Sequence, residues 1–228
     1  DVPTNGTQSD TGAGGEVSGN YATFNPLKQS SNTTLSNGNL DIAIGGSSNQ
    51  QTFTTFGMSS GKWYCEFKHT SGSYPLYGIS DDNSPLTSAP GGSSSGNSYA
   101  FGYQGKKWND GTPATYSTQP SNGDIIGVAF DADNGTLAFY VNGTSLGNAY
   151  TSIPSGTYFM VCGTDGTNSE FNAGQRAFAY SAPSGYKALC TTNLPTPTIA
   201  DGSDYFEAKL YTSETTISGL SFSPDPTW

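Results

Sequence analysis

Apolar and polar residues alternate with a period of two in several short stretches of this chain, which is the pattern of half-buried β-strands. In residues 61–68, Trp63, Cys65 and Phe67 point to one side of such a strand, and the residues between them point to the other. The alternation predicts an antiparallel strand with one face in the core and one in solvent. The same reasoning predicts a hairpin over 34–44 around Asn37-Gly38 and strands at 77–80, 99–103, 158–162 and 170–172.

Two turn signals between apolar runs predict one consistent register. If Asn134-Gly135 is a two-residue type I′ loop, Phe130 lies opposite Phe139. A second loop of this kind at Asn142-Gly143 places Leu146 opposite Phe139, on the same apolar face. We therefore predict a three-stranded meander whose apolar residues all face the core.

Two long polar stretches interrupt these strands. Residues 81–98 hold almost nothing to bury, and residues 104–122 are polar apart from Trp108 and Tyr116. Both stretches are predicted to be loops, and loops on a rigid scaffold commonly carry binding residues.

The composition favours a folded all-β chain. Gly, Ser, Thr and Asn supply 106 of the 228 residues, whereas 8 residues are basic and 18 acidic. An ordinary domain has about 25% charged residues, so a charge-rich helical protein or coiled coil is excluded. Fourteen Tyr, twelve Phe and three Trp provide enough apolar surface to order the chain. Short strands with frequent turns predict an antiparallel β-sandwich.

The net charge of −10 excludes two classes of partner. Nucleic acids and anionic membrane surfaces are negatively charged, so the electrostatic contribution to their binding has the wrong sign. No apolar run approaches the roughly 20 residues of a membrane-spanning helix. We therefore expect no nucleic-acid partner and no membrane insertion.

No pattern of reactive side chains indicates catalysis or a cofactor. The three cysteines, Cys65, Cys162 and Cys190, are an odd number without C-x-x-C spacing, and we expect them to be buried thiols rather than a disulfide framework. His69 is the only histidine, and we expect it at the surface near the end of a strand. A nucleophile motif that would use this histidine is absent.

Carboxylates also give no site. Glu66 and Glu170 have no acidic neighbour two residues away on the same strand, whereas a glycoside hydrolase needs two carboxyls on either side of the bond. Residues 131–135 are interpreted as a hairpin turn rather than a calcium loop, because the glycine comes too early and no bidentate Glu follows. We expect no enzyme, no metal and no cofactor, and hydrolysis is the least favoured alternative.

The candidate binding residues are aromatic and polar side chains of the predicted loops. Exposed aromatic rings stack on sugars or anchor protein interfaces, because they bury a large area at little entropic cost. If they cluster with residues 81–98, they form a lectin-like patch. The alternative is that Trp108 plugs the end of the sandwich. The candidates are Tyr74, Trp108, Asn109, Asp110 and Tyr116.

The chain divides into three parts. Residues 1–20 are an extended arm, 21–192 the sandwich, and 193–228 a linker with a short β extension that docks on the sandwich or continues into a neighbouring module. The arm and the extension could each add a strand to the sheet edge of another copy, giving a homo-oligomer. Because the sequence lacks an initial Met, we expect a fragment or a cleaved product.

The chain carries a series of short motifs: Gly61-Lys62-Trp63-Tyr64 with Glu66, Tyr77-Gly78-Ile79, Gly123 to Val128 with Asp131, Gly135-Thr136-Leu137 with Phe139-Tyr140, and Asn142-Gly143. A last motif follows at 172–178. In order and spacing, these motifs from about residue 20 to 190 resemble a SPRY domain. The last one resembles the closing motif of that family, which more often has Phe where this chain has Ala before the Gly.

The form of the sequence is similar to SPRY proteins of bacteriophages, on the basis of Asn25-Pro26-Leu27 and residues 189–195, 209–212 and 222–225. This resemblance implies a bent two-sheet jelly roll related to concanavalin A-like lectins, with partners held by loops at one end and no catalytic residues. We therefore expect a noncatalytic module of a virion, in a tail fibre or surface appendage. It would contact host-surface glycans or proteins, other virion proteins, or itself. A lectin-like module outside a virion is the alternative.

Overall fold

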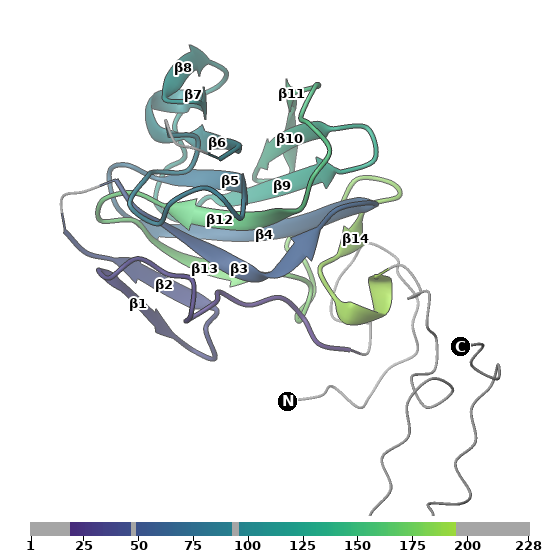
Figure 1. Cartoon of the computed structure of the whole chain (residues 1–228), viewed down its shortest axis with the longest axis horizontal. Helices are drawn as coiled ribbons and strands as arrows, with labels where there is room; N and C mark the ends of the chain where they lie inside the picture. The colour runs from purple at the N-terminus through teal and green to yellow at the C-terminus, as the bar shows by residue number, and fades with distance from the viewer. Residues whose placement is uncertain (1–18, 47–48, 93–95, 195–228) are drawn as a thin grey trace, which may run out of the picture. The chain divides into compact units, whose positions relative to one another are not determined.

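In the computed structural model, which describes residues 19–46, 49–92 and 96–194, the strands form two sheets packed face to face (Figure 1). One sheet has the order β1-β2-β13-β4-β9-β10-β11, with β14 beside β4, and the other has the order β3-β12-β5-β6-β7-β8. All pairs are antiparallel except β14 with β4. This arrangement confirms the predicted all-β antiparallel sandwich.

The strands and two short 3-10 helices have the following bounds: β1 Thr33–Ser36, β2 Asp41–Ile44, β3 Gln51–Met58, β4 Lys62–Ser71, β5 Leu76–Asp81, β6 Ser98–Gly102, η1 Tyr103–Gly105, β7 Lys106–Asn109, β8 Thr112–Thr115, β9 Ile125–Asp131, β10 Thr136–Val141, β11 Thr144–Tyr150, β12 Tyr158–Gly163, β13 Asn168–Asn172, β14 Lys187–Ala188 and η2 Thr191–Asn193. The predicted first hairpin is β1–β2, with Leu35 opposite Ile42. Of the predicted arm (1–20) and the predicted extension (193–228), residues 1–18 and 195–228 lie outside the described residues.

The core between the sheets is built mainly from aromatic rings. Full burial of one such side chain contributes about 1.5–3 kcal/mol, so these rings are a major source of stability. The ring centroid of Phe67 of β4 lies 5.0 Å from that of Phe171 of β13 and 5.1 Å from that of Tyr77 of the opposite sheet. Other fully buried rings are Phe24, Trp63, Phe101, Phe130, Phe139 and Tyr158.

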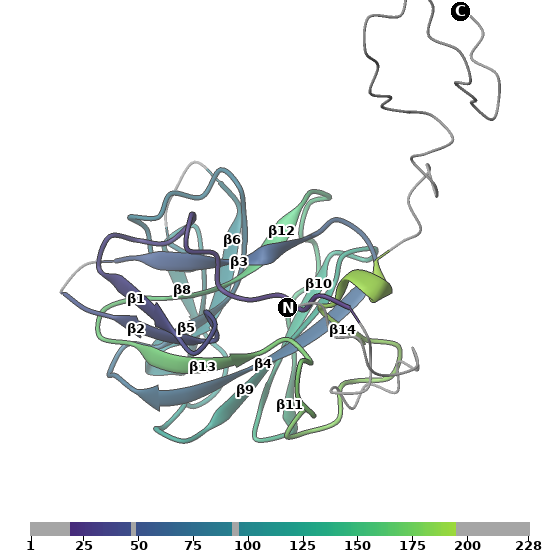
Figure 2. The same cartoon turned by 90° about the horizontal axis from the view of Figure 1, so that it is seen from below.

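Strand β4 is buried on both faces from Trp63 to Phe67, whereas the alternation predicted one solvent face. Trp63, Cys65 and Phe67 face the core as predicted, but Tyr64 and Glu66 on the other face are only 1% and 3% exposed. The segment 173–190 covers that face, and it includes β14, which lies beside β4 in Figure 2. The half-buried prediction was wrong because a loop-like segment supplies a second layer.

The β9–β10 hairpin differs in register from the prediction by two residues. Phe130 pairs with Leu137 and not with Phe139, and the loop contains residues 132–135. The Asp131 carboxylate accepts hydrogen bonds from the Asn134 backbone N–H at 3.1 Å and from its side-chain amide at 2.8 Å. This cap stabilises a longer loop than the type I′ turn. Because the shift is even, the predicted apolar face remains in the core.

The second turn of the meander is confirmed. Val141 pairs with Thr144 across a two-residue loop in which Asn142 has φ 49° and Gly143 has φ 76°, as a type I′ turn requires. The register then shifts twice, between Tyr140 and Ala138 and between Ala138 and Leu137. Leu146 still packs against the main core, as predicted.

Residues 104–122 contain a hairpin, although they were predicted to be a loop. Strands β7 and β8 pair across Asp110 (φ 50°) and Gly111 (φ 69°). All four residues of β8 are exposed, so this edge strand has no apolar alternation to reveal it. The turn signal at Asp110-Gly111 was the only local evidence for the hairpin.

Candidate functional site

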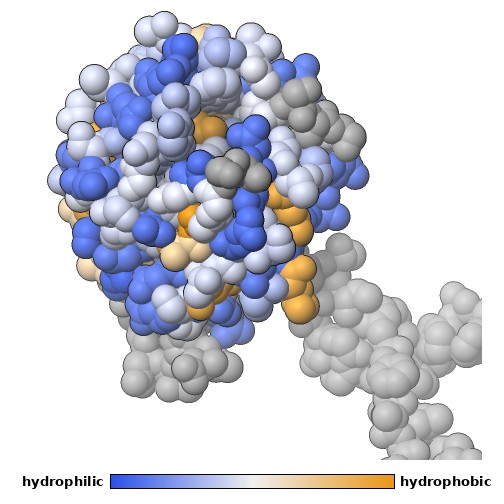
Figure 3. All heavy atoms as spheres, turned by 90° about the vertical axis from the view of Figure 1, so that its left-hand side faces the viewer, coloured by the Kyte–Doolittle hydropathy of each residue, from blue (hydrophilic) through white to orange (hydrophobic). Residues whose placement is uncertain are grey.

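A groove of about 750 Å³ opens where three connections of the six-stranded sheet meet. Tyr74 comes from the loop before β5, Tyr103 and Trp108 flank the start of β7, and Pro85 and Pro90 come from the loop between β5 and β6. Figure 3 faces the loops on the left-hand side of Figure 1 and shows apolar surface recessed within a mostly hydrophilic face. The remaining lining residues are Asn49, Leu76, Thr87, Ser88, Ala89, Gly92, Gly111, Thr164 and Asp165.

Three aromatic rings form one wall of the groove. The centroids of Tyr74 and Tyr103 are 4.8 Å apart, and Tyr103 stacks on Trp108 at 6.3 Å with 17° between the ring planes. The indole Nε1 donates to the Tyr103 carbonyl at 3.4 Å. Trp108 and Tyr103 also pack on a small cluster formed by Leu76, Ala89 and Ala100. Trp108 therefore closes one part of the fold and lines the groove at the same time.

The structure brings together only some of the candidate residues. Tyr74 and Trp108 share the groove with residues of the 81–98 loop, as the prediction required. The Asn109 amide donates to the Ser98 carbonyl at 3.0 Å, and Asp110 occupies the adjacent turn. Tyr116 does not line the groove, since its ring packs on Phe101 at 5.3 Å in the main core.

Several groove residues were missed from the sequence. Tyr103 was counted as part of an alternating strand, but β6 ends at Gly102 and the ring turns toward the groove. Pro85 and Pro90 were visible signals, because a loop with little else to bury still contained two apolar rings. Thr164 and Asp165 follow β12 and gave no local signal.

The loop between β5 and β6 is fixed at its base by a buried carboxylate. Asp81 accepts hydrogen bonds from the backbone N–H of Asn97 at 2.9 Å, from the Ser84 hydroxyl at 3.2 Å and from the Asn83 N–H at 3.2 Å. Burial raises the pKa of Asp81, but the hydrogen bonds from Asn97, Ser84 and Asn83 together outweigh burial and hold the pKa below its usual range. The carboxylate therefore organises the loop in its ionised form.

A chain of buried polar side chains holds the middle of the same loop. Ser98 Oγ accepts the Gly91 N–H at 2.7 Å and lies 2.6 Å from Ser80 Oγ. Ser80 donates to the Gln51 side-chain oxygen at 2.9 Å, and Gln51 Nε2 donates to the Pro85 carbonyl at 2.9 Å. The groove wall is thereby preformed, which reduces the entropy lost on binding.

On the other side of the groove, the backbone of Tyr74 is anchored while its ring is exposed. The Thr164 and Thr167 hydroxyls both donate to the Tyr74 carbonyl. The Tyr74 side chain remains 43% exposed. A fixed backbone with an exposed ring suits a contact residue, because little backbone entropy is left to lose.

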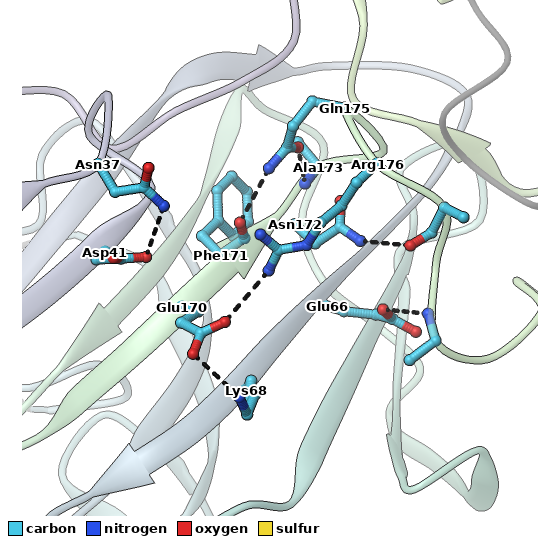
Figure 4. A network of polar contacts seen from close by, with 12 residues as sticks. Asn37, Asp41, Glu66, Lys68, Glu170, Phe171, Asn172, Ala173, Gln175 and Arg176 are labelled. Carbon is cyan, nitrogen blue, oxygen red and sulfur yellow. Dashed lines mark hydrogen bonds and ion pairs between the residues drawn. The ribbon is translucent and has the colours of Figure 1, made fainter.

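A smaller depression of about 230 Å³ contains Glu66 and Glu170 (Figure 4). Glu66 accepts the backbone N–H groups of Ala179 and Tyr180 at 2.8 and 2.9 Å, and its burial raises its pKa. Glu170 forms ion pairs with Lys68 at 3.0 Å and Arg176 at 3.6 Å. Neither acid has an acidic neighbour on its own strand, but the pairing of β13 with β4 places both in this depression. Both carboxylates hold the segment 173–190 in place, Glu66 through hydrogen bonds and Glu170 through its ion pair with Arg176.

The remaining reactive side chains, those of the histidine and the three cysteines, are buried within the fold. His69 is 1% exposed, so its predicted surface position was wrong. The predicted burial of the cysteines is confirmed, since Cys65, Cys162 and Cys190 are all buried. Within the described ranges, His, Cys, Asp and Glu form no group of three suited to a metal ion. In the same ranges, no helix is long and apolar enough to cross a membrane.

Comparison with known proteins agrees with this architecture. The chain is 32% identical over 126 residues to the E3 ubiquitin-protein ligase RKP of Arabidopsis thaliana. The aligned region covers 53% of this chain and 10% of that protein. It therefore spans about a tenth of that relative's length. The SPRY domain of human HERC1 superposes with a TM-score of 0.54 at 17% identity, covering 65% of this chain and 96% of that domain.

The TRIM65 PSpry domain gives a TM-score of 0.55 at 18% identity, covering 67% of this chain and 92% of that domain. These two solved structures share the fold with this chain. The SPRY domain model matches residues 42–176, which is more than half of the sequence. SPRY domains are generally noncatalytic modules that mediate protein–protein interactions. The chain belongs to the SPRY domain family.

Proposed function

We propose that this chain is a noncatalytic binding module whose groove holds a segment of a partner protein. The observation that carries this proposal is the meeting of Tyr74, Tyr103 and Trp108 in one groove. Interface anchors are enriched in such aromatic residues and lie in well-packed pockets. The polar network beneath the loop between β5 and β6 keeps the groove open without a ligand. The general role of SPRY domains in protein–protein interaction supports the same function.

The biological setting that we propose is a bacteriophage particle, in a tail fibre or another surface appendage. The support is the phage-type pattern at 25–27 and 189–195, together with a surface rich in Gly, Ser, Thr and Asn. Partners in that setting are other virion proteins, copies of this chain, or host-surface molecules. Mass spectrometry of purified particles tests this setting, and repeated absence of the chain would overturn it.

The binding function is tested by substitution in the groove. Peptides selected from a random display library on the full chain should lose most of their affinity when Tyr74→Ala removes the exposed ring. Trp108→Ala should do the same, but it also costs stability because the indole packs on Leu76. Tyr180→Ala is the matched control, since Tyr180 is 37% exposed and does not line the groove. If no selected peptide responds to Tyr74→Ala, the groove is not the binding site.

A second candidate function is lectin-like carbohydrate binding. Aromatic rings beside the hydroxyl groups of Thr87 and Ser88 favour it, because sugars stack on rings and bond to hydroxyls. A glycan array probed with the full chain and with Tyr74→Ala tests this candidate. Glycan binding that is lost in the variant supports it, and an array without signal excludes it for the glycans tested.

A further inference from the structure

The aromatic groove continues into a second groove of different chemistry. The second groove has a volume of about 720 Å³ and shares Asn49 and Thr87 with the first. Each groove alone has the size of a small-molecule site, for which about 300–1,000 Å³ is usual. Together the two grooves therefore have enough volume for a segment of a polymer, and more than a single small molecule needs.

The second groove is lined almost entirely by uncharged hydrogen-bonding side chains. Asn32, Asn49 and Thr87 are exposed, so their amide and hydroxyl groups are accessible to a ligand. A side-chain amide offers both donors and an acceptor, as a peptide bond does. A row of such groups therefore matches the alternating N–H and C=O groups of an extended peptide. The full lining is Gln29, Ser30, Ser31, Asn32, Asn49, Gln50, Leu86 and Thr87.

Charge restricts the ligand further. Asp165, at the aromatic end, is the only charged residue that lines either groove in the described part of the chain. The whole chain carries a net charge of −10. An acidic ligand would meet this field without a cation to pair with, whereas a basic group near Asp165 would be attracted.

The walls of the aromatic end favour a peptide over a sugar. One face of the Trp108 ring is stacked on Tyr103, so that face is not available as a platform for a sugar ring. Pro85, Pro90 and Leu76 provide aliphatic surface instead. Such a lining accepts an apolar side chain as an anchor.

We propose that the two grooves form one elongated site for an extended peptide without acidic residues. An apolar or proline anchor lies against Tyr74 and Trp108, a basic residue lies near Asp165, and the uncharged remainder follows Thr87 and Asn49 toward Asn32. This inference rests on the proposed binding function, since it names the chemistry of the ligand for the same groove.

The test uses peptides selected from a random display library on the full chain. We expect the selected sequences to be depleted in Asp and Glu and to combine an apolar anchor with Lys or Arg. The double variant Asn32→Ala/Asn49→Ala should weaken a selected peptide by about tenfold, as expected for two lost hydrogen bonds. Asp165→Asn should reduce the affinity of peptides that contain Lys or Arg. Asn148→Ala, an exposed amide on β11, should have no effect.

The outcomes separate this inference from the proposed function. If Tyr74→Ala abolishes binding while the double alanine variant binds as the parent does, the second groove is not used and the inference fails, although the binding function stands. Selection of acidic peptides also overturns it. If neither variant affects binding, both proposals fail. Binding confined to a neutral oligosaccharide array overturns the peptide as occupant.

Discussion

The Tyr77 hydroxyl lies 2.9 Å from Nδ1 of His69 and joins the two sheets through a buried hydrogen bond. His69 Nε2 lies 3.1 Å from the Gly72 carbonyl, which only accepts, so Nε2 carries a proton. Burial lowers the pKa of His69 and favours the neutral ring, in which Nδ1 then accepts from Tyr77. Ser169 Oγ lies 2.7 Å from the same hydroxyl and donates to it. The three side chains form one directional network, and its direction requires a neutral imidazole.

Tyr77→Phe should therefore destabilise the protein by about 1–3 kcal/mol. The substitution leaves the His69 nitrogen and the Ser169 hydroxyl buried without their partner, and an unsatisfied buried polar group costs about that much. Urea denaturation at neutral pH measures the effect. Tyr74→Phe is the control, because Tyr74 is exposed and should change stability little. Equal stability of both variants would contradict the network.

The pH dependence of stability should reveal His69. Burial lowers the pKa of this imidazole, while the bond to Gly72 and the charge of Asp124 oppose the shift without reversing it. Between the unfolded pKa of about 6.5 and the lower folded pKa, the unfolded chain binds more protons than the folded chain. Stability is therefore full above about pH 6.5 and falls as the pH decreases through this window.

The variant His69→Gln isolates that contribution. Its free energy of unfolding should lie below that of the parent at neutral pH, and the difference should shrink as the pH falls toward about 5, below the unfolded pKa. Denaturation at several pH values measures the two curves. The raised pKa of Glu66 acts in the opposite direction, but it is present in both proteins and cancels. A difference that is constant with pH would disprove the assignment.

The sandwich could be predicted because its signals are local. The alternation at Trp63, Cys65 and Phe67 and the turn at Asn142-Gly143 depend on residues close in sequence. Tyr64 and Glu66 were misassigned because their cover comes from residues 173–190, more than one hundred positions away. His69 was misassigned for a different reason: its partner Tyr77 is close in sequence but belongs to the other sheet, and the packing of two sheets cannot be read from one strand.

The site could be predicted only in part. Tyr74 and Trp108 were named as candidates because large aromatic residues are conspicuous in polar stretches, and the structure places them in one groove with residues of the 81–98 loop. Tyr103 and Asp165 were not foreseen, since their place in the groove depends on how strands β6 and β12 pair with β5. The hydrogen bond from the Asn134 N–H to the Asp131 side chain stabilises a longer β9–β10 loop, so the register differs from the one predicted for a type I′ turn.

Thr54→Val should stabilise the protein. Thr54 is 1% exposed, and its hydroxyl oxygen has no hydrogen-bond partner among the described residues. Valine has nearly the same shape and removes the uncompensated polar group, which costs about 1–3 kcal/mol when buried. Thermal unfolding of the variant should show a higher Tm than the parent.

Thr52→Val on the same strand is the matched control. Thr52 is also fully buried, but its hydroxyl lies 3.0 Å from that of Thr33. The same substitution there breaks a hydrogen bond and should lower the Tm. If both variants move the Tm in the same direction, hydrogen bonding does not distinguish the two positions.

Asp81→Asn should loosen the loop that forms the groove and weaken ligand binding. The variant replaces one oxygen that accepts hydrogen bonds by an amide that donates, so the contacts from Asn97 or from Ser84 and Asn83 are lost. Bonds to a charged group contribute about 1.5–3 kcal/mol each. We expect a comparable loss in the free energy of unfolding, together with lower affinity for a peptide selected on the parent.

The lowered pKa of Asp81 determines how the stability difference between the parent and Asp81→Asn changes with pH. The folded pKa of Asp81 lies below the unfolded value of about 3.9, so its contribution to stability is full above that pH and is lost as the pH falls through the folded pKa. The stability difference between the parent and Asp81→Asn should therefore stay constant from neutral pH to about pH 5 and shrink below about pH 4. Ser84→Ala, which removes one of the donors, should show a smaller loss. If Asp81→Asn lowers stability but leaves peptide affinity unchanged, the order of this loop does not control the groove.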